Sequence, residues 1–369
     1  MMARSKRTKA RQSRGGDRPS THKQAEIPRD DLLIAVLSDV RGRRILCTSQ
    51  GRAQFAAAAA EALPEAEVYC HFLDVYQAEL ARQVNAGGPS NLTIACSADL
   101  PGGDFDVVAF PFHSGGEAEL TRDLMQSGFE TLHDGGRMIA STNNPKDTWL
   151  HEQMQTLFDK VTRREIEREG VIYLGTKTKP LKKRKNFQCE FAFRDRETLV
   201  QAVSRPGVFS HRKLDGGARA LINSLNVRDG ERVFDIGCGC GAVGFAAAMR
   251  AEGVHVYAVD SNARAVQCAA RGAELNSLGS YTVLLDARGR CDALGTYDLA
   301  VGNPPYFSNY RIAEIFLQAA MQALKPDGRI HVVAKHVDWY VERMQQLFDG
   351  VAVDAGKNYS VIVGTRRES

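Results

Sequence analysis

The stretch RVFDIGCGCGAVGFAAAMRAEGVHVYAVD, residues 232–260, predicts a strand, a glycine-rich turn, a helix and a second strand in direct succession. The apolar runs at residues 232–236 and 254–260 have the length and composition of buried strands. Residues 243–252 between them predict a helix of the kind that crosses over between two parallel strands. This stretch therefore predicts an open α/β sheet, and the same alternation continues on both sides of it.

A second feature lies downstream, where another predicted strand ends in a stiff corner. Residues 297–301 form an apolar run that breaks into Gly302-Asn303-Pro304-Pro305-Tyr306-Phe307. Neither proline can donate a hydrogen bond to a neighbouring strand, so the strand must stop there. Open α/β sheets bind their ligands at the carboxyl ends of their strands. We therefore expect a site that presents a side-chain amide, two carbonyls and aromatic faces, although an ordinary proline-terminated loop would carry the same residues.

The first half of the chain, from about Leu32, predicts the same layout. Strands are expected at residues 44–48, 67–72 and 105–110, with helices at 53–63 and 117–128. Repetition of landmarks in one order indicates an internal duplication. The predicted fold class is therefore α/β, with two tandem doubly wound Rossmann-like domains. The matching segments are 105–108 with 297–300, 133–139 with 325–330, 158–161 with 348–351, and 171–176 with 361–365.

The two copies differ where chemistry is expected. The second has Gly237-Cys238-Gly239-Cys240-Gly241 where the first has Ser49-Gln50-Gly51-Arg52. The second also has Asn303-Pro304-Pro305-Tyr306 where the first has Phe110-Pro111-Phe112-His113. The first copy therefore keeps the fold signals and lacks the site, so we expect it to be degenerate and to serve structure or substrate recognition. The predicted division is a disordered basic tail (1–30), the degenerate domain (31–195) and the catalytic domain (196–369).

Composition and charge limit the class of protein. The 369 residues are 43% hydrophobic and 25% charged, as in globular proteins, and no apolar run approaches a membrane span. Eight scattered cysteines without a paired CxxC predict reduced thiols, no zinc and no disulfide framework. The net charge of +4 is unevenly placed, because the tail is basic. Such a tail attracts polyanions, and the alternatives are an organelle signal or a merely solubilising segment.

The glycine loop and two carboxylates indicate a nucleotide-like cofactor. Gly239-x-Gly241-x-x-Gly244 fits the dinucleotide fingerprint, so the loop by itself does not separate NAD from other such ligands. Asp260 ends the next strand, nineteen residues after Gly241, where a carboxylate can accept hydrogen bonds from ribose hydroxyls. Asp286 follows the strand expected at residues 281–285 and can meet an adenine amino group. Either aspartate taken singly is also a common helix cap or loop residue.

These motifs resemble those of a known family. The second half resembles the class I S-adenosylmethionine-dependent methyltransferases, and the whole chain resembles the bacterial ribosomal RNA guanine-N2 methyltransferases. Those enzymes consist of two tandem methyltransferase-like domains, of which the first lacks a cofactor site. The residues that carry the resemblance are Pro206-Gly207-Val208-Phe209-Ser210, Leu214-Asp215-x-Gly217, the loop Asp235–Gly241, Asp260 and Asn303-Pro304-Pro305-Tyr306.

The resemblance implies S-adenosylmethionine as cofactor and ribosomal RNA or a ribosomal subunit as partner. The reduced thiols indicate a cytoplasmic protein, and the lack of an apolar span predicts no membrane contact. The chain is expected to be a monomer. One departure concerns the base, because the family commonly has Asn-Pro-Pro-Phe followed by His and this chain has Tyr306-Phe307-Ser308. Asn-Pro-Pro-Tyr-Phe is similar to the tRNA adenine-N6 methyltransferases. The alternatives are therefore adenine-N6 methylation of tRNA or other RNA, methylation of a release-factor glutamine or of DNA adenine, or a non-catalytic RNA-binding or ribosome assembly factor.

The expected chemistry places each site residue. Asn303 Oδ1 and the Pro304 carbonyl are expected to accept the two N–H bonds of an exocyclic amine, while Tyr306 and Phe307 stack on the base. No metal is expected. The predicted catalytic residues are Asn303, Pro304, Pro305 and Tyr306. The predicted cofactor-binding residues are Phe209, Asp215, Asp235, Gly237, Cys238, Gly239, Gly241, Asp260, Ser261, Asp286, Ala287 and Asn303. The predicted substrate contacts are Tyr306, Phe307, Arg212, Lys213 and the basic run Lys182, Lys183, Arg184 and Lys185.

Overall fold

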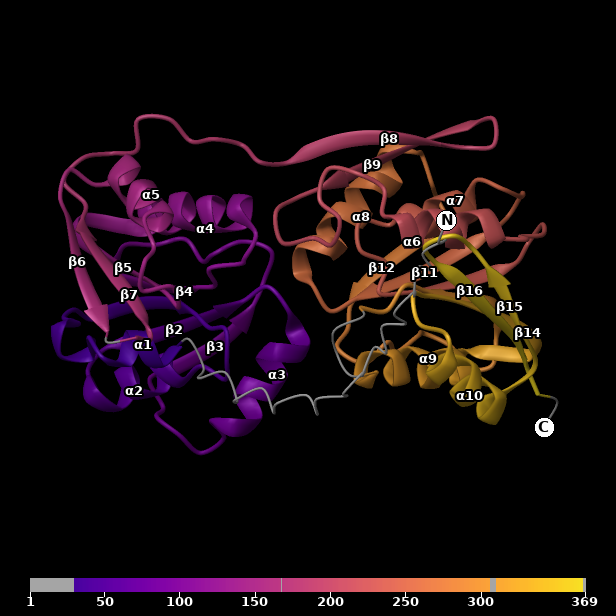
Figure 1. The fold of residues 1–369 in the computed structure, drawn as a ribbon, viewed down its shortest axis with the longest axis horizontal. Helices are drawn as coiled ribbons and strands as arrows, with labels where there is room; N and C mark the ends of the chain where they lie inside the picture. Colours follow the sequence, from indigo (N-terminus) through magenta and orange to yellow (C-terminus); the bar gives the residue numbers. More distant parts are fainter. Residues whose placement is uncertain (1–29, 167, 306–309, 368–369) are drawn as a thin grey trace, which may run out of the picture.

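The chain folds into two halves, each built on one seven-stranded sheet (Figure 1). The structure, a computed structural model, describes residues 30–166, 168–305 and 310–367. Residues 1–29 of the predicted tail and the residues Tyr306 and Phe307 therefore lie outside the described residues. Asp30, which the predicted disordered tail includes, is instead buried at the start of the first helix. None of the helices within the described ranges combines the length and apolar character needed to cross a bilayer.

The first sheet has the strand order β3-β2-β1-β4-β5-β7-β6. Its first five strands run parallel, and β7 is antiparallel to β5 and β6. Its elements are α1 (Asp30–Ile34), η1 (Leu37–Asp39), β1 (Arg44–Thr48), α2 (Gln54–Ala62), β2 (Glu67–Phe72), α3 (Val75–Val84), β3 (Leu92–Cys96), β4 (Phe105–Phe112), α4 (Ala118–Thr131), β5 (Leu132–Thr142), α5 (Trp149–Leu157), β6 (Val161–Ile166) and β7 (Gly170–Thr176).

The second sheet repeats this topology, with the order β12-β11-β10-β13-β14-β16-β15. Its elements are α6 (Gly216–Ser224), β10 (Arg232–Ile236), α7 (Ala242–Ala248), β11 (His255–Asp260), α8 (Ala263–Leu275), β12 (Tyr281–Leu285), β13 (Tyr297–Gly302), α9 (Arg311–Ala323), β14 (Leu324–Ala334), α10 (Asp338–Leu347), β15 (Phe348–Ala355) and β16 (Ser360–Arg366). The identical strand order confirms the predicted fold class and the predicted duplication.

Most of the predicted elements have the expected bounds, and β13 stops at Gly302 directly before the Asn-Pro-Pro corner. The helix predicted over residues 243–252 is shorter, because α7 ends at Ala248. Beyond that end, the Arg250 guanidinium donates to both Asp195 carboxylate oxygens at 2.7 and 2.8 Å and to the Ile222 carbonyl at 2.7 Å. These side-chain contacts fix a residue that helical periodicity assigned to the helix.

A β-hairpin between the two sheets belongs to the second half. Strands β8 (Cys189–Asp195) and β9 (Thr198–Ser204) pair antiparallel with each other, and Figure 1 shows them above α8. Phe193, Val200 and Ala202 of this hairpin are buried in the same core cluster as β10 and α7. The expected division between residues 195 and 196 falls in the turn of this hairpin, so packing assigns the whole hairpin to the second core.

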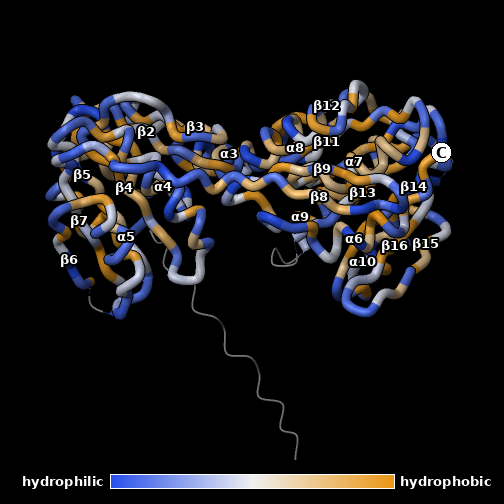
Figure 2. Tube along the Cα trace, turned by 90° about the horizontal axis from the view of Figure 1, so that it is seen from above, coloured by the Kyte–Doolittle hydropathy of each residue, from blue (hydrophilic) through white to orange (hydrophobic). Residues whose placement is uncertain are grey.

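Apolar residues lie inside each half and polar residues outside (Figure 2). The central strands are buried on both faces, as parallel sheets covered by helices require. In β10, for example, Val233, Phe234, Asp235 and Ile236 are all buried. The carboxyl ends of the second sheet's parallel strands are thereby held in one place.

The two halves meet through equivalent loops of the duplicated units. Asp74, before α3, pairs antiparallel with Asn262, before α8, and both side chains cap their helices. The Val75 N–H donates to the Ser261 carbonyl at 2.7 Å, and the Ala263 N–H donates to the Leu73 carbonyl at 2.8 Å. Matching segments that exchange bonds in this way form a self-complementary contact, as at a two-fold interface.

Candidate active site

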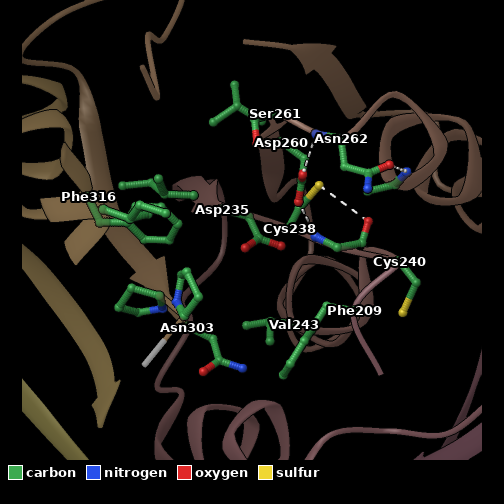
Figure 3. Close-up of a pocket in the computed structure, with 18 of the residues that line it drawn as sticks. Phe209, Asp235, Cys238, Cys240, Val243, Asp260, Ser261, Asn262, Asn303 and Phe316 are labelled. Carbon is green, nitrogen blue, oxygen red and sulfur yellow. Dashed lines mark hydrogen bonds between the residues drawn. The ribbon is translucent and has the colours of Figure 1, made fainter. Parts of the chain in front are cut away.

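A cavity of about 380 Å³ lies at the carboxyl ends of β10, β11, β12 and β13. Figure 3 shows Asp260 and Ser261 at one end, Asn303 and Phe209 at the other, and Asp235 between them. The structure therefore brings together most of the residues that the sequence singled out. Those that line the cavity are Phe209, Lys213, Asp215, Asp235, Gly237, Cys238, Gly239, Asp260, Ser261, Asp286, Ala287, Asn303, Pro304 and Pro305.

The glycine loop between β10 and α7 leaves room for a ligand against the main chain. Gly239 has φ +56°, and a Cβ added there would meet no atom within 4 Å. Gly241 does not line the cavity, but its φ of +88° and a Cβ position 2.4 Å from the Phe245 ring require glycine. The loop is therefore an open cradle at Gly239 that is held in shape by its neighbours.

Two carboxylates lie under this loop: Asp235 is buried, and Asp260 is half-buried at the cavity wall. Asp260 accepts hydrogen bonds from the N–H groups of Gly239 and Asn262, both at 2.8 Å. Asp235 accepts one from the Gly244 N–H at 3.0 Å. Burial outweighs these bonds and raises the pKa of Asp260 to about 6 and that of Asp235 to about 7.

These pKa values predict a pH-dependent stability. Between about pH 4 and 7 the folded chain holds protons on Asp260 and Asp235 that the unfolded chain has released, so the free energy of unfolding falls as the pH rises. We expect Asp260→Asn to reduce this slope by about 1 kcal/mol per pH unit between pH 4 and 6. Asp235→Asn should reduce it up to about pH 7. Urea titrations at several pH values measure the slope, and equal slopes in all three proteins would contradict the assignment.

The cysteines of the loop are poor nucleophiles. Burial raises the pKa of Cys240 to about 12 and that of Cys238 well above its ordinary value, so both thiols stay protonated. Within the described ranges, no group of three or more His, Cys, Asp or Glu side chains is placed to hold a metal ion. The arrangement favours chemistry by positioning over chemistry by a thiolate.

Asp215 fixes the orientation of the Asn303 amide. One oxygen of Asp215 accepts hydrogen bonds from the N–H groups of Gly217 at 2.8 Å and Ala218 at 3.1 Å, which caps α6. The same oxygen accepts a third bond from Asn303 Nδ2 at 2.9 Å. A carboxylate only accepts, so the amide must turn its NH₂ group toward Asp215 and its Oδ1 away. The corner therefore presents an acceptor in a defined direction.

Two of the residues predicted to bind the cofactor, Ser261 and Asp286, form hydrogen bonds within the chain at the cavity wall. Ser261 donates its hydroxyl hydrogen bond to Asp74 of the first half at 2.6 Å. Asp286 accepts from the N–H groups of Arg288 and Arg290 at 2.8 and 2.9 Å, and from the Arg290 side chain at 2.8 Å. Asp286 therefore shapes the turn that places Ala287 and Gly289 on the cavity.

The predicted phosphate contacts are divided by the structure. Lys213 lines the cavity and is exposed. Arg212 instead forms a bidentate ion pair with Glu119 of the first half, at 2.8 and 3.1 Å. Arg184 pairs with Glu130 and donates to Ser127, and none of the four basic residues at 182–185 lines the cavity. Arg212 and Arg184 therefore use their charge within the chain, which a local count of basic residues does not reveal.

The structure also adds residues that the sequence did not single out. Asp74, Tyr76 and Gln77 of the first half line the same cavity, as do Ile312 and Phe316 of α9. The sequence did contain one signal for this wall. Asp74 lies two residues after the end of β2, and Asn262 lies two residues after the end of the equivalent strand β11.

Comparisons with known proteins agree with this fold. Residues 200–363 match the family model described as methyltransferase small domain. The chain is 23% identical over 324 residues to a ribosomal RNA small subunit methyltransferase C from Pseudoalteromonas translucida, covering 86% of this chain and 93% of the relative. It is 27% identical over 253 residues to the protein of that name from Marinomonas sp., covering 63% and 69%.

One solved structure shares the whole two-domain arrangement. It is described as the T. thermophilus 16S rRNA N2 G1207 methyltransferase (RsmC) in complex with AdoMet and guanosine. The TM-score is 0.74 with 19% identity, and the match covers 90% of this chain and 91% of that one. At this identity the likeness establishes the fold.

Proposed function

We propose that the chain is a member of the bacterial family of tandem-domain ribosomal RNA methyltransferases and that it methylates the exocyclic N2 amine of a guanine in ribosomal RNA. The methyl donor is S-adenosylmethionine. The observation that carries the proposal is the orientation of the Asn303 amide, which donates a hydrogen bond to Asp215. This amide lies at the rim of a cavity in which the glycine loop leaves space for a nucleoside.

The residues of the cavity fit this cofactor. The main chain at Gly237, Cys238 and Gly239 forms its floor, and the open space at Gly239 admits a ligand that a Cβ would exclude. Asp260 supplies acceptor oxygens for ribose hydroxyls, and Asp286 and Ala287 border the place for the base. When bound, S-adenosylmethionine supplies a sulfonium methyl group that is already activated for transfer.

The chain's own contribution to the reaction is alignment. The lone pair of an exocyclic amine is delocalised into the ring, which makes the amine a weak nucleophile. Asn303 Oδ1 and the Pro304 carbonyl accept hydrogen bonds from the two N–H groups of the amine. These bonds orient the lone pair of the amine and stabilise the positive charge that develops on its nitrogen. The proton leaves after transfer, so no side chain is assigned as a general base.

We assign the remaining substrate contacts from the sequence. Tyr306 and Phe307 stack on the base once it has left its helix, and Lys213 contacts a phosphate near the cavity. Phe209, which is 59% exposed, closes over the cofactor. The eight cysteines are free thiols, which suits a cytoplasmic protein, and the chain acts as a monomer.

The first domain has no cofactor site of its own in this proposal. At its counterpart of the glycine loop, the buried Asp30 carboxylate accepts hydrogen bonds from the Ser49 hydroxyl at 2.5 Å and the Gln50 N–H at 3.0 Å. Polar groups of this loop therefore form hydrogen bonds with the chain itself. We assign residues 30–188 to this domain, which supports structure and substrate recognition, and residues 189–369, with the hairpin, to the catalytic domain.

The test is methylation of RNA followed by nucleoside mass spectrometry. Ribosomal subunits, naked ribosomal RNA and tRNA from cells that lack the gene are incubated with the purified chain and labelled cofactor. We expect N2-methylguanosine in ribosomal RNA. N6-methyladenosine would overturn the choice of base, and a protein that neither transfers methyl groups nor binds the cofactor in equilibrium dialysis would overturn the proposal as a whole.

A further inference from the structure

We propose that the first domain completes the cofactor site of the second: Tyr76 and Gln77 bind the nucleoside end of the cofactor, and Arg52 positions Gln77. This inference rests on the proposed function, since it takes S-adenosylmethionine as the ligand. It gives the domain without a glycine motif a direct part in cofactor binding.

The start of α3 forms a wall of the cavity. Tyr76 and Gln77 line it together with Gly239, Asp260 and Asp286, although about 160 residues or more separate the two groups in the sequence. The antiparallel contact between Asp74 and Asn262 holds the wall in place, and the Ser261 hydroxyl donates to Asp74 at 2.6 Å. The wall therefore adjoins the ends of β11 and β12, where the ribose and the base are expected.

The Gln77 amide has a defined orientation. Arg52 Nη1 donates a hydrogen bond to Gln77 Oε1 at 2.8 Å. A guanidinium has donors only, so it fixes the carbonyl end of the amide and turns the Nε2 donors away from itself. Ribose oxygens and adenine ring nitrogens are acceptors, which complement an Nε2 donor at this wall.

Arg52 is itself anchored. Its Nη1 also donates to the Gly51 carbonyl at 2.9 Å, and its own carbonyl accepts from Asn85 Nδ2 at 2.9 Å. Arg52 stands in the segment Ser49-Gln50-Gly51-Arg52 that replaces the glycine motif in the first copy. The loop that lacks its own cofactor chemistry thus positions a residue for the neighbouring site.

Tyr76 offers an aromatic face at the same wall. The guanidinium carbon of Arg311 lies 5.8 Å from the centre of the Tyr76 ring. Arg311 begins α9, whose residues Ile312 and Phe316 also line the cavity. The ring therefore closes the space between the first domain and α9, where an adenine would find an apolar surface.

The experiment measures the binding of two ligands by isothermal titration calorimetry. S-adenosylhomocysteine contains both the nucleoside and the amino acid part of the cofactor, whereas 5′-methylthioadenosine lacks the amino acid part. We expect Gln77→Ala to weaken both ligands about tenfold, the equivalent of one lost hydrogen bond. Gln77→Glu should have the same effect, because it keeps an acceptor for Arg52 but has no donor. Gln83→Ala, on the same helix but not among the residues that line this cavity, is the matched control and should bind like the wild type.

Arg52 and Tyr76 give independent tests. Arg52→Ala should weaken both ligands about threefold to fivefold in the wild type and add nothing in the Gln77→Ala background, as expected for a residue that acts through another. Tyr76→Leu should weaken both about fivefold. Thermal unfolding of the ligand-free proteins controls for folding.

The outcomes are distinct. Wild-type affinity in both Gln77 variants and in Tyr76→Leu would overturn the inference. Weaker S-adenosylhomocysteine with unchanged 5′-methylthioadenosine would overturn the assignment to the nucleoside end. A wild-type protein that binds neither ligand would overturn the proposed function itself.

Discussion

Replacing Asn303 with alanine is expected to lower methyl transfer by about two or more orders of magnitude and to leave cofactor affinity within about threefold of the wild type. The amide lies at the rim of the cavity, opposite the Asp260 end (Figure 3). Its Nδ2 donates a hydrogen bond to Asp215 at 2.9 Å. The acceptor Oδ1 is therefore preorganised toward the place where charge develops during transfer. Alanine removes that acceptor and leaves the glycine loop untouched.

Single-turnover transfer and calorimetric binding together check this prediction. Asp215→Ala is an informative companion, because it removes the oxygen that accepts the hydrogen bonds of Gly217, Ala218 and Asn303. We expect it to lower transfer about tenfold through the lost orientation of Asn303. Asn226→Ala, on the loop before β10, is a control that should transfer at the wild-type rate. Wild-type transfer by Asn303→Ala would refute the assigned role.

Local patterns predicted the fold and the centre of the site for a physical reason. Strand and helix periods, the glycine turn and the Asn-Pro-Pro corner each act within a few residues, so each is visible in the sequence. Because the strands β10 to β13 are parallel, their carboxyl ends lie at the same edge of the sheet. The duplication could be predicted because short matching segments occur in the same order in both halves.

The contacts between the two halves could not be predicted in this way. Tyr76 and Gln77 reach the cavity through the pairing of two loops that lie 188 residues apart, at Asp74 and Asn262. Arg212 looks like a free cation in the sequence, but Glu119 neutralises it across the same interface. Such partners depend on how two folded surfaces meet, and no local period encodes that choice.

One buried ion pair shows how strongly these surfaces depend on each other. Arg264, near the start of α8, is 1% exposed and contacts Asp123 of α4 at 2.7 Å. Its remaining donors reach the carbonyls of Ala98 and Pro206, both at 2.8 Å. Burial lowers the pKa of Arg264, and the nearby Asp123 opposes that shift. The guanidinium thus depends on a carboxylate from the other half.

Removing that carboxylate is expected to destabilise the chain severely. Asp123→Ala leaves the Arg264 charge buried without its partner, so we expect the free energy of unfolding to fall by about 3–5 kcal/mol. Urea denaturation measures the change. Arg271→Ala, on the same helix as Arg264, is the matched control, because its pair with Glu274 is exposed and contributes about 1 kcal/mol or less.

The double variant Asp123→Leu with Arg264→Met separates charge from packing. It replaces both charged groups by apolar side chains, so we expect it to recover most of the stability that Asp123→Ala loses. An Asp123→Ala protein as stable as Arg271→Ala would contradict this account. Because α8 begins beside the loop Asp260–Asn262, Asp123→Ala should also weaken cofactor binding, whereas the double variant should restore it. Stability of the domain contact and affinity of the cavity would then change together, as expected where one domain forms a wall of the other domain's site.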